Sequence, residues 1–289
     1  EDDASEPSSV KRPPRVFLSY AHDDAGFSDL VRRFYEFLRI DCGIDAVFDR
    51  VAAETPQEWT GWMLRQRGEA DCSRCGGSPQ YKAARETALP AGVPVVLFNR
   101  PPSGTPHDSL NVDNYAGTYT VVRHFSALGH RRIAILTGAA GNFDATERLR
   151  GYHAALRDAG LTALSELIIP GDFSEAAGER GTRELLKLRD RPTAIFAAND
   201  GMAIGALSAL REAGLQVPED IAVGGFDDIA MARYVNPTLT TVHIDISALG
   251  ERAAASLLSV LRHPERRTFT RETVATTLVV RQSCGARVA

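Results

Sequence analysis

The stretch AIFAANDGMAIGALSAL, residues 194–210, limits most narrowly what this chain can fold into. Its first five residues are apolar on both faces, which is typical of a parallel strand buried between two layers of helices. Apolar residues then follow at helical spacing from Met202 to Leu210, and Gly214 ends the pattern. A buried strand that runs directly into a helix predicts a parallel α/β sheet.

A polar pair, Asn199 and Asp200, stands where this strand meets its helix. An Asn or Asp at a helix start can cap the free backbone N–H groups. The carboxyl ends of the strands are also where ligands bind in open α/β sheets. One polar residue is enough for a cap, so we expect the second to be available to a ligand.

Two further junctions between a strand and the segment that follows it repeat this pattern. RRIAILTG (131–138) is a strand that ends in a Gly-rich loop, and the helix TERLRGYHAALRDAG (146–160) follows it, with Gly160 as its stop. IAVGGFDD (221–228) is another buried strand that ends in an aromatic residue and two carboxylates. We expect the three junctions to bring one set of side chains to the same edge of the sheet: Arg148, Asn199, Asp200, Phe226, Asp227 and Asp228.

The residue types in this set fit a polyhydroxylated ligand. Arg donates from a fork, Asn and Asp supply donors and acceptors for hydroxyls, and an aromatic ring fits the apolar face of a sugar. No nucleophile with a base and an orienting partner accompanies them. His153 and His243 are the nearest candidates, and since we place neither at the carboxyl end of a strand, we interpret both as surface or packing residues.

Composition excludes several other classes of protein. A net charge of −4 gives no basic face for nucleic acid, and no apolar run reaches the roughly 18 residues of a membrane helix. Four cysteines in 289 residues are too few for a disulfide framework. Cys72 and Cys75 form a C-x-x-C without a second ligand pair, so we interpret them as free thiols in a loop and expect no metal and no cofactor.

Several stretches, in order along residues 87–289, resemble the effector-binding core of the LacI/GalR transcriptional regulators. They are AGVPVVLFNRP, DSLNVDNYAGTYTVVRHFSALGHRRIAILTG, ERLRGYHAALRDAG, AIFAANDGMAIGALSALREAGLQVPEDIAVGGFDD and NPTLTTVHIDISALGERAAASLL. The resemblance implies a two-lobed clamp, similar in fold to periplasmic sugar-binding proteins, that closes on a small effector, commonly a sugar. Operator DNA would be contacted only through a helix-turn-helix headpiece that we do not find in this sequence.

The resemblance also implies roles for particular residues. Arg148 would hold hydroxyls or a carboxylate of the effector, and Asn199 and Asp227 would hydrogen-bond it from the second lobe. Phe226 and the pair Asp113-Asn114 match less specifically, and a helix cap is the alternative for the latter. The family further implies a homodimer, which we expect to be held mainly by the second lobe.

The first 86 residues depart from this family. SYAHDD and EWTGWM resemble the first two boxes of the SEFIR branch of TIR-like signalling domains, with strands in RVFLSY and IDAVFD and a helix between them. The third strand of such a domain belongs near residues 70–78, where we find no buried strand. Glu54 and Glu58 are the only acidic residues near the second box, which makes an NAD hydrolase a remote alternative.

We therefore expect an α/β, two-lobed, type I periplasmic-binding-protein-like fold with parallel sheets flanked by helices. A flavodoxin-like SEFIR/TIR-type βαβα unit would replace its N-terminal part and could pair beside VPVVLFN. The expected order is a flexible tail (1–14), the SEFIR/TIR-like segment (15–86), the remainder of the first lobe (87–138), the second lobe (139–240), and a crossover through TTVHID with the C-terminal return (241–289).

The expected function is that of a cytoplasmic, non-enzymatic effector-binding core that takes a small molecule, a sugar, and has no membrane contact. The alternative is a protein-protein interaction module, in which the SEFIR/TIR-like segment pairs with like domains and the regulator core is a sensor scaffold. Stabilisation by small sugars would favour the first function. Self-association that survives deletion of residues 87–289 would favour the second.

Overall fold

The computed structural model describes residues 15–19, 45–48, 72–75, 96–98, 108–263 and 268–286. Its strands are β1 (Arg15–Ser19), β2 (Asp45–Phe48), β3 (Cys72–Cys75), β4 (Val96–Phe98), β5 (Asp108–Val112), β6 (Ile133–Leu136), β7 (Ile168–Ile169), β8 (Ala194–Ala197), β9 (Ala222–Asp227), β10 (Thr240–His243), β11 (Arg271–Val274) and β12 (Thr277–Val279). Its α-helices are α4 (Asn114–Ala127), α5 (Phe143–Asp158), α6 (Glu175–Leu186), α7 (Asp200–Glu212) and α8 (Ile246–Arg262), and short 3-10 turns are η3 (Ser165–Leu167), η4 (Ala230–Arg233) and η5 (Gln282–Cys284).

The second lobe is built on a six-stranded sheet in the order β12-β10-β9-β8-β6-β7. All pairs are parallel except β10 with β12. The prediction that strands near 166–169, 194–198 and 221–225 share one parallel sheet is therefore confirmed. The predicted helix stops are confirmed as well, since Gly160 and Gly214 adopt φ values of 66° and 71° just after α5 and α7.

Strand alternation assigns the helices to the two faces of this sheet. In β6, Ile133 and Ile135 pack in a cluster with residues of α4 and α5, while Ala134 and Leu136 pack with residues of α6 and α7. Successive side chains of a strand point to opposite faces, so a strand covered on both sides must be apolar throughout. The burial of all four residues of β6 follows from this sandwich.

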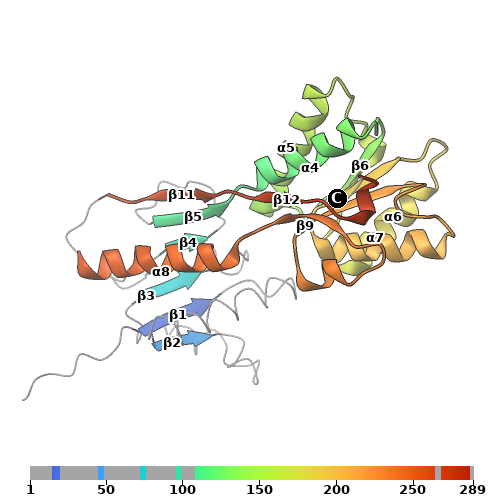
Figure 1. Ribbon diagram of the computed structural model, residues 1–289. Helices are drawn as coiled ribbons and strands as arrows, with labels where there is room; N and C mark the ends of the chain where they lie inside the picture. The colour runs from blue at the N-terminus through green and yellow to red at the C-terminus, as the bar shows by residue number, and fades with distance from the viewer. Residues whose placement is uncertain are drawn as a thin grey trace, which may run out of the picture.

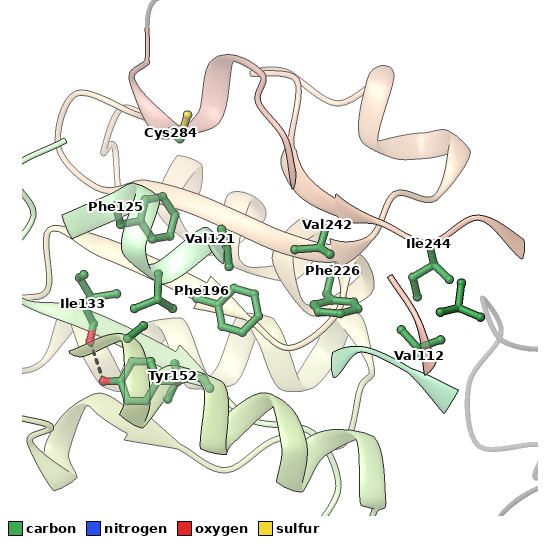
Figure 2. Packing of buried hydrophobic residues seen from close by; sticks show 14 of the residues in the cluster. Val112, Val121, Phe125, Ile133, Tyr152, Phe196, Phe226, Val242, Ile244 and Cys284 are labelled. Atoms are coloured by element: carbon green, nitrogen blue, oxygen red, sulfur yellow. Dashed lines mark hydrogen bonds between the residues drawn. The ribbon is translucent and has the colours of Figure 1, made fainter. Parts of the chain in front are cut away.

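The cluster under α4 and α5 contains the largest buried side chains, including Phe125, Phe196 and Phe226 (Figure 2). Tyr152 of α5 is also fully buried, and its hydroxyl donates to the carbonyl of Ile133 at 2.8 Å. That bond satisfies the only polar group of the tyrosine side chain and fixes α5 against β6.

On the opposite face, glycines let α6 and α7 cross at backbone contact. A Cβ on Gly178 would lie 2.1 Å from the carbonyl oxygen of Met202, and one on Gly205 would lie 2.0 Å from that of Glu175. Both positions must therefore lack a side chain. The close crossing holds the loop before α6 against the start of α7, where Asn199 lies.

The first lobe contains a parallel sheet in the order β11-β5-β4, and α8 packs on β4 and β5. β1, β2 and β3 form a second parallel sheet in the order β2-β1-β3. β3 contacts β4, so the N-terminal strands extend the layer of the first lobe (Figure 1). The expected pairing beside VPVVLFN is not among the strand pairs of the described residues, since β3 and β4 are in contact but belong to separate sheets.

Three sequence expectations need correction. Residues 72–75, expected to be loop, form β3, because pairing with β1 sets this strand and the local side-chain pattern does not reveal such pairing. β6, expected in the first lobe, pairs with β7 and β8 in the six-stranded sheet. His243, which we did not place at a strand's carboxyl end, is the last residue of β10.

Three segments connect the two lobes (Figure 1). The first runs from β5 to α4, the second from β10 to α8, and the third from β11 to β12. The second confirms the predicted crossover through TTVHID. Because β9 and β10 are parallel and β10 leads into α8 of the first lobe, the carboxyl edge of the six-stranded sheet faces the first lobe.

Candidate functional site

Arg148 of α5 lies at the centre of this sheet edge and is only 5% exposed. Its Nε donates to Oδ1 of Asn114 at 2.8 Å, its Nη1 donates to the carbonyl of Ala198, and its Nη2 donates to Oδ1 of Asp227 at 3.3 Å. The guanidinium carbon lies 3.8 Å from the ring centroid of Phe226. The alternative of a surface ion pair with Asp144 or Glu147 is therefore wrong, because Arg148 is buried and pairs across the lobe.

Asp227 ends β9 and enters a turn with an unusual backbone. Its φ is 110° and that of Asp228 is 53°, values that few non-glycine residues adopt. The turn directs the two adjacent carboxylates to different partners. Asp227 faces Arg148, and Asp228 accepts from Nη2 of Arg281 at 2.6 Å. Neither caps η4, whose N-cap is Ile229, so the helix-cap alternative for Asp227 and Asp228 is also wrong.

The polar pair that opens α7 is used differently from what we expected. Asn199 is the N-cap: its Oδ1 accepts from the N–H of Met202 at 2.9 Å and its Nδ2 donates to the carbonyl of Phe173 at 2.9 Å. Asp200 is fully buried and accepts from the N–H of Ile229 at 2.9 Å and from the hydroxyl of Thr241 at 2.5 Å. Both side chains thus hold the framework of the site, and ligand contact by either of them stays a prediction.

Burial has an electrostatic consequence at Asp200. Removal from water, with the nearby Asp227 carboxylate as the second cause, raises the pKa of Asp200 well above its usual value. The carboxyl oxygen Oδ1 also lies 2.2 Å from the position that a Cβ on Gly225 would take. Asp200 therefore fits only beside a glycine in β9.

Two aromatic rings lie near the Arg148 guanidinium, and they differ in exposure. Phe226 is fully buried, with one ring face under the Arg148 guanidinium and its edge against Gly117 of α4, so it supports Arg148. Phe173, which sequence reasoning missed, is partly exposed, and its ring centroid lies 5.9 Å from the Arg148 guanidinium carbon. The signal that could have found Phe173 is its place four residues after β7, at the same sheet edge.

Asp113 and Asn114 lie at the first crossover. Asp113 is the N-cap of α4, and its Oδ1 accepts from the N–H of Ala116 at 2.9 Å. The side chain of Asn114 accepts from Arg148 and donates to Asp144 at 2.8 Å. The cap accounts for the residue type at position 113, and Asn114 ties the first crossover to Arg148.

The arrangement supplies donors, acceptors and one partly exposed ring, and it supplies few groups for catalysis. His153 is exposed, with its ring against Tyr152. Within the described residues no group of three or more His, Cys, Asp or Glu could hold a metal ion. No helix of the described part of the chain is long and apolar enough to cross a bilayer. Glu54 and Glu58 lie outside the described residues.

Comparison with known proteins identifies relatives of this chain. The chain is 36% identical over 180 residues to the HTH-type transcriptional repressor PurR of Aliivibrio salmonicida, covering 61% of this chain and 54% of that protein. It is 35% identical over 191 residues to PurR of Mannheimia succiniciproducens, covering 66% and 57%. The chain thus spans about half the length of the curated relatives that it matches.

Solved structures extend the likeness to nearly the whole chain. The transcriptional regulator CelR in complex with cellobiose matches with a TM-score of 0.81 and 28% identity, over 95% of this chain and 86% of that one. The Escherichia coli repressor ascG matches with a TM-score of 0.74 and 26% identity, over 93% and 98%. The model of the periplasmic binding protein-like domain matches residues 122–284, more than half of the chain. The chain belongs to the periplasmic binding protein-like domain family and has the ligand-binding core of the LacI-family transcriptional regulators.

Proposed function

We propose that this chain binds a small polyhydroxylated effector, a sugar, at the carboxyl edge of the six-stranded sheet, and that it performs no catalysis. The observation that carries the proposal is the buried Arg148–Asp227 pair at the edge that faces the first lobe. A guanidinium has five N–H groups, and three have protein acceptors here, so two can serve hydroxyls. The solved CelR structure, which contains cellobiose, supports a sugar as the class of ligand.

Each side chain has a distinct role in this proposal. Asp227 has two oxygens with about four acceptor positions, which is enough for Arg148 and a sugar hydroxyl. Phe173 offers a ring to the apolar face of the sugar. Asn199 acts through the backbone that it fixes, since its amide holds the loop at Phe173. Asp113 and Phe226 likewise act by holding α4 and Arg148 in place.

The relatives are repressors of transcription, which supports our proposal of a transcription-regulating role in the cytoplasm for the protein that contains this core. We propose operator DNA as a partner only through a helix-turn-helix headpiece, the feature for which the PurR relatives are named. We also propose a homodimer held mainly by the second lobe. Met231 and Tyr234, which are 53% and 80% exposed on and just after η4, give that lobe an apolar surface.

Calorimetry with a panel of pentoses, hexoses and disaccharides, including ribose and cellobiose, tests the binding proposal. Asp227→Asn should weaken the best sugar by about 10- to 100-fold, as expected for loss of a hydrogen bond to a charged group worth about 1.5–3 kcal/mol. Asp220→Asn is the control, because Asp220 lies at the opposite end of β9 and accepts from the N–H of Gln216. Circular dichroism must show both variants folded.

Three results would contradict the proposal. The first is a folded parent chain that binds no sugar of the panel. The second is an Asp227→Asn variant that binds the best sugar as tightly as the parent does. The third is binding of a flat heterocycle such as a nucleobase in place of every sugar, which would keep the site at Phe173 and change the class of ligand.

A further inference from the structure

Asp228 holds a second ionic cluster directly behind the candidate site. Its side chain is only 2% exposed. Oδ1 accepts from Nη2 of Arg281 at 2.6 Å, and Oδ2 lies 3.0 Å from Nδ1 of His243 and 3.9 Å from Nη2 of Arg233. A carboxylate this well buried requires such partners, since an unpaired buried charge is costly.

Two of these partners lie close to the connections between the lobes. His243 is the last residue of β10, and α8 of the first lobe begins three residues later. Arg281 follows β12, the strand that returns from the first lobe. It is fixed there, because its Nη1 donates to the carbonyl of Leu239 at 2.7 Å and its backbone N–H donates to Oγ1 of Thr240 at 2.8 Å. One carboxylate thus contacts the last residue of β10, where one interlobe segment begins, and a residue just beyond β12, the strand into which another interlobe segment leads.

The turn at residues 227–229 joins this cluster to the candidate site. Asp227 and Asp228 are consecutive, both have positive φ, and they face Arg148 and Arg281 respectively. Such backbone conformations cost energy and persist only where the surroundings enforce them. The constrained turn is therefore the route by which a change at the Asp227 carboxylate would be expected to affect Asp228.

We propose that Asp228 is a positioning residue that couples the Asp227 carboxylate to the carboxyl ends of β10 and β12, next to the β10–α8 and β11–β12 crossovers. The sugar-binding role of Asp227 rests on the function proposed above. The coupling between Asp227 and the crossovers does not, and it is measurable in the chain without ligand.

A double-mutant cycle read by hydrogen–deuterium exchange tests this coupling. The variants are Asp227→Asn, Asp228→Asn and the double variant, in the full chain without sugar. Asparagine keeps the side-chain size and tolerates positive φ, so the substitution removes the charge alone. The reporters are the amides of residues 241–245 and 277–281, and the amides of β6 and β8 serve as references. Asp220→Asn, at the other end of β9, is the matched control.

The expected result is selective and non-additive. Asp228→Asn should speed exchange in both crossovers by about tenfold relative to β6 and β8, a typical size for coupling between sites. Asp227→Asn should speed it by about threefold in the parent background and not at all when Asp228 is already Asn. Asp220→Asn should leave the crossovers unchanged.

Either of two results would overturn the coupling. The first is an equal acceleration of amide exchange in the crossovers and in β6 and β8, which a purely structural role of Asp228 would produce. The second is an additive effect of the two substitutions on exchange in the crossovers. If Asp228→Asn fails to fold, His243→Gln replaces it, because that side chain is 44% exposed. That variant should then speed exchange at 241–245 and reduce the effect of Asp227→Asn there, and no change at those amides would contradict the proposal. A chain that binds no sugar can still show the non-additive cycle, so failure of the proposed function and failure of the coupling are distinguishable.

Discussion

Replacement of Arg148 by methionine is the most direct test of how the candidate site is built. Methionine has a comparable length and fills an irregular apolar space well, so little is lost in packing volume. What is lost is the guanidinium, which serves the side chain of Asn114, the carbonyl of Ala198 and the carboxylate of Asp227. The substitution therefore separates the polar role of Arg148 from its bulk.

The structure sets the size of the effect. Asn114 and Ala198 are each 1% exposed, so water cannot replace the arginine there, and each acceptor left unsatisfied costs about 1–3 kcal/mol. Asp227 has a side chain that is 18% exposed and can recover part of its hydration. Removal of one member of a buried ion pair costs about 3–5 kcal/mol in other proteins. We expect Arg148→Met to lower the free energy of unfolding of the second lobe by about 3–5 kcal/mol.

Arg150→Met provides the matched control on the same helix. Arg150 donates to both carboxylate oxygens of Glu147 at 2.7 Å, but its side chain is 62% exposed. An exposed pair contributes about 0–1 kcal/mol. Urea denaturation followed by far-UV circular dichroism measures both variants against the parent. Equal losses for the two variants, or a loss below about 1 kcal/mol for Arg148→Met, would refute the view of Arg148 as the buried centre of the site.

Two further predictions concern pH and assembly. The raised pKa of Asp200 means that folded protein keeps a proton that unfolded chain releases above about pH 4, so the stability contributed at this residue falls as pH rises from there toward the folded pKa. Asp200→Asn removes this dependence: urea denaturation at pH 5 and pH 8 should show the variant gaining on the parent at pH 8, and an unchanged or opposite difference would contradict burial as the cause. Tyr234→Asp places a charge on the exposed surface of the second lobe and should raise the dimer dissociation constant at least about tenfold in sedimentation experiments. A parent that is monomeric at tens of micromolar, or a variant that dimerises as the parent does, would contradict the second-lobe dimer.

The sheet of the second lobe could be predicted because its strands are covered on both faces. Such strands must be apolar throughout, so β8 and β9 can be recognised in the sequence as uninterrupted runs of apolar residues and glycine between helical patterns. β3 was missed because Cys-Ser-Arg-Cys contains no such run, and its strand conformation depends on pairing with β1. β6 was legible as a strand, but sequence alone did not show which sheet it joins, since that depends on the path of the chain through three crossovers.

The site was predictable at the level of position and not at the level of partners. Arg148, Asn199 and Asp227 do gather at one sheet edge, because all parallel strands of a sheet end on the same side. The sequence did not show which residue of the Asn199-Asp200 pair caps the helix. In the structure Asn199 caps α7, while Asp200 is buried and accepts hydrogen bonds from Ile229 and Thr241. Both residue types can cap, and only the packing of β9 and β10 against α7 decides which one does.

The inward orientation of Arg148 could have been inferred from helical geometry. Arg148 precedes Tyr152 by four residues, so the two share one face of α5, and an aromatic side chain such as that of Tyr152 favours the inward face. An arginine on that face requires buried acceptors, and three carboxylates at the neighbouring junctions were available: Asp200, Asp227 and Asp228. Side-chain chemistry does not distinguish them, since all three are aspartates within hydrogen-bonding reach of the same sheet edge. The backbone does, because positive φ at residues 227 and 228 turns the first carboxylate toward Arg148 and the second toward Arg281. The choice of partner thus depends on the conformation of the turn at residues 227 and 228, which local sequence does not specify, and this is why the pair could be identified only in the folded chain.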